Sequence, residues 1–167
     1  MTFNTSRFAI FLIAYFILLT SAEAQNKPES GCLPASSMKA EQLHGRWAVR
    51  FTRPPAGLPE RATMLLQRHA EFSESLAGSV SRDLGWNAAP AGQGGHAAQA
   101  ALAGDLDEGL LLLDESSDNI AITGTWNGEM KPGSCGTVYQ GVWKDTSNHA
   151  APDDTGIPFT ITKIPAR

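Results

Sequence analysis

The chain has 167 residues with 13 basic and 17 acidic side chains, a formal charge of −4, and two cysteines. This acidic balance, without a basic cluster, excludes a protein that binds a phosphate backbone, so no nucleic acid is expected as a partner. Apart from an apolar run near the N-terminus, no apolar segment or long linker divides the chain, and its length suits one domain with its own core.

Residues 1–24 are predicted to be a secretory signal peptide. Arg7 precedes an uninterrupted apolar run over residues 8–19, and small residues follow it at Ala22 and Ala24. The run spans only about 18 Å as a helix, against the ~30 Å core of a bilayer. We therefore expect cleavage after Ala24 and an exported mature chain, periplasmic or extracellular, without a stable membrane anchor.

The two cysteines are Cys32 and Cys135. In an oxidising compartment an even pair is expected to be bridged, so we predict one disulfide between them. It would tie the N-terminal segment to the later part of the domain. Two lone thiols without neighbouring ligands do not indicate a metal site, and neither a metal nor a cofactor is expected.

Residues 25–42 are predicted to form an N-terminal arm that ends in a short helical turn. Prolines and a glycine interrupt the first part of the arm, which offers little to bury. Ser36 or Ser37 is expected to cap a turn over residues 38–42, with Glu41 near the reciprocal capping position.

From Leu43 onward, short runs alternate apolar and polar residues between turns rich in proline and glycine, a pattern typical of half-buried strands. Eight strands are predicted, at about residues 43–52, 62–69, 74–82, 101–107, 110–114, 120–127, 139–143 and 157–163. In the sixth strand, Ile120 and Ile122 are expected to share the inward face with Trp126. The run 110–113 is apolar on both faces, so its outer face should be covered by the N-terminal turn or by a partner subunit.

Five of these strands carry a glycine that is flanked, two residues away on either side, by large apolar residues. The triplets are Leu43-Gly45-Trp47, Leu76-Gly78-Val80, Leu102-Gly104-Leu106, Ile122-Gly124-Trp126 and Tyr139-Gly141-Trp143. Inward glycines are tolerated where strands coil sharply or where large side chains opposite need room, as when a small sheet closes on itself. We therefore predict an all-β domain over residues 43–167, an eight-stranded antiparallel up-and-down (meander) barrel, with a β-sandwich as the alternative.

The first strand, with its pattern Leu43-x-Gly45-x-Trp47 after a helical turn, resembles the opening of the calycin-type barrels, which include lipocalins, avidins and the bacterial secreted inhibitors of metalloproteases. Residues 124–127, Gly-Thr-Trp-Asn, are similar to a phrase found in avidins. A second lipocalin signature is absent, and the biotin-contacting set of an avidin does not map onto the chain residue by residue. The resemblance implies a meander barrel with an open mouth and does not transfer a ligand.

Between the third and fourth strands lies a run without periodicity. Residues 83–98 are rich in glycine and alanine, so we predict a long surface loop at about 83–100. Its glycines lack the spacing of a dinucleotide-binding fingerprint, and no helix opens after them. Trp86 in this loop either packs against the barrel rim or is available to contact a ligand, so it joins the candidate binding residues.

No constellation for catalysis is found, so we do not expect an enzyme. There is no Gly-x-Ser-x-Gly elbow, a bridged Cys135 is no nucleophile, and the 4 histidines are scattered without the spacing of a metal site. A group of acids is expected on outward positions and turns as a solvated edge, without the spacing of an EF-hand calcium loop. These acids are Asp105, Asp107, Glu108, Asp114, Glu115 and Asp118.

The candidate binding site is the set of inward aromatic side chains. Eight strands leave an interior only just wide enough for side chains or for one small ligand. Trp47 is expected to fill one end of the barrel. Trp126, Tyr139 and Trp143 would line an open mouth. Arg82 is expected on the same inward face of its strand, where it would make a polar contact with the ligand.

Two functions fit this reading. The first is an exported noncatalytic binding protein that holds a small apolar or amphipathic ligand in the barrel mouth. The second is an exported protein-interaction module, such as an inhibitor of a protease or of another exported enzyme, that acts through the arm before Cys32 or the rim loops near Trp86. An unfilled interior would favour the first function and a filled one the second.

Overall fold

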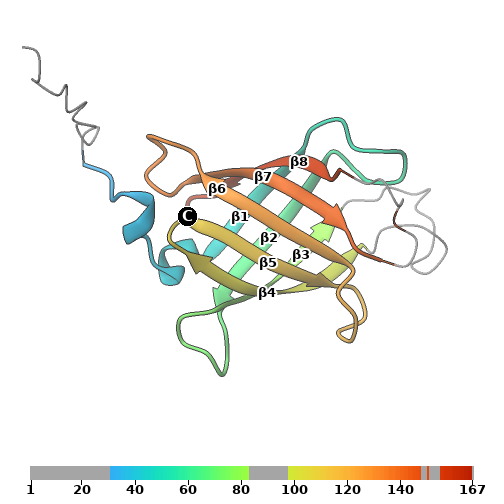
Figure 1. Ribbon diagram of the computed structural model, residues 1–167, viewed down its shortest axis with the longest axis horizontal. Helices are drawn as coiled ribbons and strands as arrows, with labels where there is room; N and C mark the ends of the chain where they lie inside the picture. The colour runs from blue at the N-terminus through green and yellow to red at the C-terminus, as the bar shows by residue number, and fades with distance from the viewer. Residues whose placement is uncertain (1–30, 83–97, 148–149, 151–154, 167) are drawn as a thin grey trace, which may run out of the picture.

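Eight antiparallel strands follow one another around a closed barrel in the computed structural model, which describes residues 31–82, 98–147, 150 and 155–166 (Figure 1). The strands are β1 Gly45–Phe51, β2 Arg61–Arg68, β3 Leu76–Arg82, β4 Gln99–Asp107, β5 Leu110–Ser116, β6 Gly124–Met130, β7 Val138–Asp145 and β8 Ile157–Lys163. Each strand pairs with its neighbours in sequence, and β1 pairs with β8 to close the sheet. The predicted meander barrel is confirmed, the β-sandwich alternative is wrong, and the architecture is consistent with a calycin-like fold.

The predicted signal peptide at residues 1–24 lies outside the described residues, as does most of the predicted loop at 83–100. Within the described part of the chain, no helix is long and apolar enough to span a bilayer.

Alternation along each strand places one face in the barrel interior. In β1, Trp47, Val49 and Phe51 are buried, and the residues between them are exposed. Trp47 lies opposite Met64 of β2, which is fully buried and lies opposite Val80 of β3. Because the register keeps buried residues opposite one another around the sheet, their faces join into one interior.

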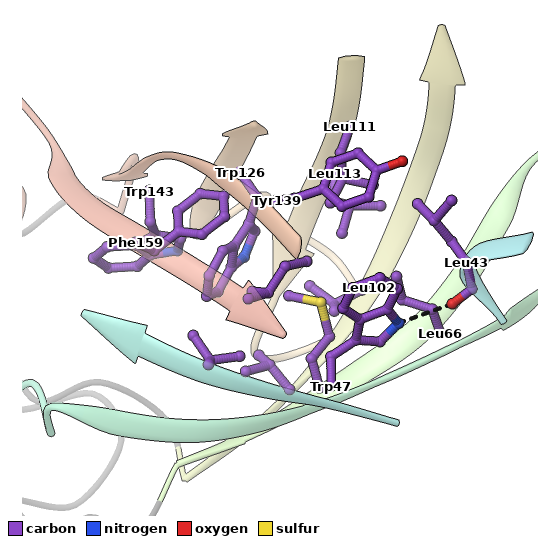
Figure 2. Packing of buried hydrophobic residues seen from close by; sticks show 14 of the residues in the cluster. Leu43, Trp47, Leu66, Leu102, Leu111, Leu113, Trp126, Tyr139, Trp143 and Phe159 are labelled. Atoms are coloured by element: carbon purple, nitrogen blue, oxygen red, sulfur yellow. Dashed lines mark hydrogen bonds between the residues drawn. The ribbon is translucent and has the colours of Figure 1, made fainter. Parts of the chain in front are cut away.

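Aromatic side chains fill much of this interior (Figure 2). Trp47, Trp126, Tyr139 and Trp143 are each at most 1% exposed. Figure 2 shows Trp126, Trp143 and Phe159 close together, while Trp47 lies nearer to Leu43 and Leu66.

The inward glycines allow close approach of backbone or rings. A Cβ at Gly141 would lie 1.9 Å from the carbonyl oxygen of Asn127 on β6, so the two strands could not keep this spacing with any side chain there. At Gly124, a Cβ would lie 2.7 Å from the indole nitrogen of Trp143. The missing side chain at Gly124 therefore makes room for an aromatic ring, and does not leave free space.

The prediction for the start of the sixth strand is wrong. Ile120 and Ile122 were expected on its inward face, but β6 begins only at Gly124, and the two side chains are 90% and 51% exposed. The cause is local, because the carboxylate of Asp118 accepts hydrogen bonds from the backbone N–H groups of Ile120 and Ala121, each at 2.9 Å. These bonds form a tight turn that competes with the extended backbone of a strand.

Two short 3₁₀ turns precede the barrel, η1 at Ala35–Ser37 and η2 at Ala40–Leu43. The expected serine cap is wrong, since neither turn has a serine at the capping position, and η2 is instead preceded by Lys39. The side chain of Gln42 accepts a hydrogen bond from the Lys39 N–H at 2.7 Å, which is the reciprocal role expected of Glu41.

These turns pack onto one end of the barrel, which we call the arm end. Trp47 donates its indole N–H to the carbonyl of Leu43 at 2.8 Å, and Leu43 is fully buried. The β4–β5 turn lies at the same end, since a Cβ at Gly109 would contact Ala35. The opposite end, which carries the β1–β2 and β5–β6 connections, is called the loop end (Figure 1).

The predicted disulfide is confirmed. Cys32 is bonded to Cys135, with the two Cα atoms 4.8 Å apart. Cys135 lies in the connection between β6 and β7. The bond therefore fastens the segment before η1 to the arm end of the barrel.

Candidate functional site

The interior holds a charged pair at the loop end. Arg82 is the last residue of β3, and Glu115 lies near the end of β5. Both are buried, and the guanidinium Nη2 of Arg82 lies 2.6 Å from Oε2 of Glu115. Taking two charges out of water is costly, so such a pair persists only where further hydrogen bonds support it.

Two tryptophans supply those hydrogen bonds. The indole N–H groups of Trp126 and Trp143 donate to the same Glu115 oxygen, at 3.0 and 3.1 Å. The guanidinium carbon of Arg82 also lies 5.4 Å from the ring centroid of Trp143, within the range of a cation–π contact. One carboxylate oxygen therefore joins three strands, β3, β6 and β7, to β5.

The prediction that Glu115 belongs to an outward acidic edge is wrong. β5 runs two residues further than expected, and Glu115 continues the inward phase of Leu111 and Leu113. The other five acids of that set are exposed, as predicted. The alternation of inward and outward residues along β5 identifies Glu115 as inward if it is continued into residues 115–118, whose polar composition predicts a turn.

The sequence-predicted binding residues divide between two aromatic groups. Toward the loop end, the ring centroid of Trp126 lies 6.2 Å from that of Trp143 and 5.0 Å from that of Phe159. Tyr139 instead contacts Trp47 edge to face, at 5.9 Å. Arg82 lies with the first group, and Trp86 lies outside the described residues.

The hydroxyl group of Tyr139 is buried, and no described residue bonds to it. Burial raises the pKa of Tyr139 from 10.0 to about 12, because the charged phenolate would be poorly solvated inside the barrel.

We expect Tyr139 to resist ionisation until the barrel itself fails in alkali. Because the folded-state pKa is raised, the neutral hydroxyl supports the fold fully below pH 10.0, and this support is lost as the pH rises toward about 12. A chain beginning at Gln25 keeps Tyr139 as its only tyrosine, so the ultraviolet absorbance of tyrosinate reports this group alone. The same chain in denaturant should titrate near 10. A folded barrel that titrates at that ordinary pH would contradict the burial described for this ring.

The β5–β6 connection, residues 117–123, forms an ordered loop at the loop end. Besides its two backbone bonds, the Asp118 carboxylate accepts the hydroxyl of Ser116 at 3.2 Å. Hydrogen bonds from the backbone of Ala121 and Ile120 lower the pKa of Asp118, so the carboxylate stays charged and keeps the turn at neutral pH.

Both flanks of this loop are also fixed to the barrel. The backbone N–H of Thr123 donates to the carbonyl of Glu115 at 2.7 Å, and the hydroxyl of Thr146 donates to the carbonyl of Ile122 at 3.3 Å. The loop therefore holds Ile120 outward on an ordered frame, without burying it. Sequence reasoning missed this surface because both isoleucines fitted the alternation of a strand.

Among the residues that the structure describes, no three histidine, cysteine, aspartate or glutamate side chains gather as a possible metal site. No protein-family model matches the chain, and no curated protein matches it. The closed eight-stranded barrel is consistent with a calycin-like fold, and no matching family supports the likeness further.

Proposed function

We propose that the chain is an exported, noncatalytic module that binds another protein through the loop end of its barrel. The observation that carries this proposal is the loop 117–123, which is tied to the barrel by hydrogen bonds and holds Ile120 90% exposed. An ordered loop loses little conformational entropy when it binds, so its exposed apolar side chain can act as an anchor.

A small ligand in the barrel mouth is less favoured by the packing. The side chains expected to line that mouth, Trp126, Tyr139 and Trp143, are buried against other side chains. The two indole N–H groups are already used by Glu115. A ligand there would have to displace these contacts and separate a buried ion pair, which costs several kcal/mol.

The charge around the loop indicates the kind of partner. Asp118 and Asp114 are exposed near Ile120 along the chain, and the whole chain carries a formal charge of −4. Charges of this sign favour a partner with basic residues and oppose an anionic lipid surface. The fitting partner is a folded protein with an apolar pocket for Ile120, bordered by basic side chains.

Replacing Ile120 with aspartate should weaken binding to such a partner at least tenfold, with no change in the stability of the barrel, because the side chain is exposed. The partner can be captured from exported proteins with a photoreactive amino acid at position 120, and its affinity for the Ile120→Asp variant then measured by calorimetry.

The matched control is Phe72, an exposed apolar residue in the connection between β2 and β3. A photoreactive residue at position 72 should not capture the same partner, and Phe72→Asp should leave affinity unchanged. Equal capture at both positions, or unchanged affinity of the Ile120→Asp variant, would contradict the proposal.

A further inference from the structure

A groove of about 530 Å³ opens at the arm end of the barrel, where β1 begins and β8 ends. It is lined by residues 44–46 and 163–166. The backbone N–H of Ile164 donates to the carbonyl of Arg46 at 2.8 Å, which holds the segment after β8 beside β1. The volume of the groove lies within the range of small-molecule binding sites.

The surface of the groove is mostly apolar, and the polar residues among its lining are basic or neutral, although the chain as a whole is acidic. They are His44, Arg46 and Lys163, and no acid is among the described residues that line the groove. The ion pairs found within the described ranges join Arg50 to Glu60 and Arg82 to Glu115, so neither Arg46 nor Lys163 has a described acidic partner.

Lys163 is held in place by uncharged groups. Its ammonium group donates to the carbonyl of Gln42 and lies 5.6 Å from the ring centroid of Trp47. Partial burial lowers the pKa of Lys163, as expected for a cation that lacks a neighbouring carboxylate. An anion at this point would restore the interaction that the fold itself does not supply.

His44 provides a further unused polar atom. Its Nε2 is buried, and no described residue bonds to it. A buried nitrogen without a hydrogen bond is unfavourable, and native proteins rarely keep one without a reason. The remaining side chains at the groove are apolar, from Ile164, Pro165 and Ala166.

We propose that this groove binds a small amphipathic carboxylate. The carboxylate lies against Lys163 with His44 beside it, and the apolar body of the ligand covers Ile164 and Pro165. Arg46 lies on the outer face of β1, so it adds positive charge near the groove without contacting the carboxylate. The site is at the opposite end of the barrel from the loop 117–123, so it is independent of the protein-binding function proposed above.

The test uses octanoate as the probe, with 1-octanol and octylammonium as matched neutral and cationic controls. Amide chemical shifts of the ¹⁵N-labelled protein are followed by NMR as each probe is added. Octanoate should produce saturable shifts at Gly45, Arg46 and Ile164, with a dissociation constant of about 1 mM, and the two controls should not. Equal shifts with 1-octanol or octylammonium, or octanoate shifts that lie elsewhere, would overturn the proposal.

Lys163→Met keeps the apolar stem beside Trp47 and removes the charge, so it should weaken octanoate binding about tenfold. Arg46→Gln, at an exposed position on the outer face of β1, should weaken binding less than Lys163→Met, and it does not disturb the bond to Gln42. Lys144→Met, at an exposed lysine of β7, is the matched control and should bind octanoate as the unchanged protein does. Unchanged affinity of the Lys163→Met variant would show that the lysine does not bind the carboxylate and would overturn the proposal.

Discussion

Replacing Glu115 with glutamine should destabilise the barrel by about 3–5 kcal/mol, although the two side chains have nearly the same shape. The variant removes the negative charge that faces the buried guanidinium of Arg82 at 2.6 Å. It also weakens the shared acceptor of the Trp126 and Trp143 indole N–H groups. Urea unfolding followed by tryptophan fluorescence would measure the loss, because two of the reporting rings contact the altered group.

Asp114→Asn is the matched control, since it makes the same chemical change one residue earlier on the outer face of β5. It should alter the free energy of unfolding by no more than about 0.5 kcal/mol. The double variant Arg82→Met with Glu115→Leu should lose less than the sum of its single variants, because it removes both charges together. A loss below about 1 kcal/mol for Glu115→Gln would mean that the ion pair contributes little.

Removing the disulfide should lower the free energy of unfolding by about 2–5 kcal/mol. Cys32 and Cys135 are 103 residues apart in sequence, so their bond restricts a large part of the unfolded chain. The double variant Cys32→Ser with Cys135→Ser should therefore unfold at lower urea concentration. Its m-value should rise, because the unfolded chain without the bond exposes more surface.

Chemical reduction of the Cys32–Cys135 disulfide is the control for the double serine variant. A thiol reductant should destabilise the unchanged protein by a similar amount and leave the double serine variant as it is. If the serine variant matches the oxidised protein in stability, the bond does not restrict the unfolded chain as its position implies.

The barrel was predictable because its signals are local and repeated. Trp47, Val49 and Phe51 show the alternation of β1 within one short run, and a proline or glycine closely follows β1, β4, β6 and β8. The inward glycines also indicated closure correctly, because β1 pairs with β8, and at Gly141 the backbones of β6 and β7 approach too closely for a side chain. Pairing between neighbours in sequence then leaves few other arrangements.

The interior charge was not predictable in the same way. Glu115 begins the run Glu-Ser-Ser-Asp, whose composition is that of a turn, and its partners come from strands elsewhere in the chain. Only the closed sheet brings Arg82, Trp126 and Trp143 to one carboxylate oxygen. The prediction that Ile120 and Ile122 face inward is wrong for the opposite reason. Their alternation suits a strand, but the hydrogen bonds of Asp118 form a local turn that overrides it.

The candidate site was predicted only in part. The side chains of Trp126, Tyr139 and Trp143 point inward, as the alternation along their strands predicts. Alternation does not tell whether inward rings border an empty cavity or pack against one another. Their contacts depend on side-chain volumes across the whole barrel, which no short run of residues records. The basic groove could not be read from the sequence at all, since its two segments lie near opposite ends of the domain.

The pairing of β1 with β8 bears on how the protein avoids aggregation. This seam joins the two ends of the barrel sequence, so it is the pairing with the greatest loop-closure cost, and its opening would expose two strand edges. The Cys32–Cys135 bond links the segment before β1 to the connection just before β7, which is the other neighbour of β8. In an oxidised molecule whose seam has opened, β1 thus stays tethered near β8. The tether gives β1 a high effective concentration near β8, so the two strands of one molecule pair again faster than either pairs with a strand of another chain.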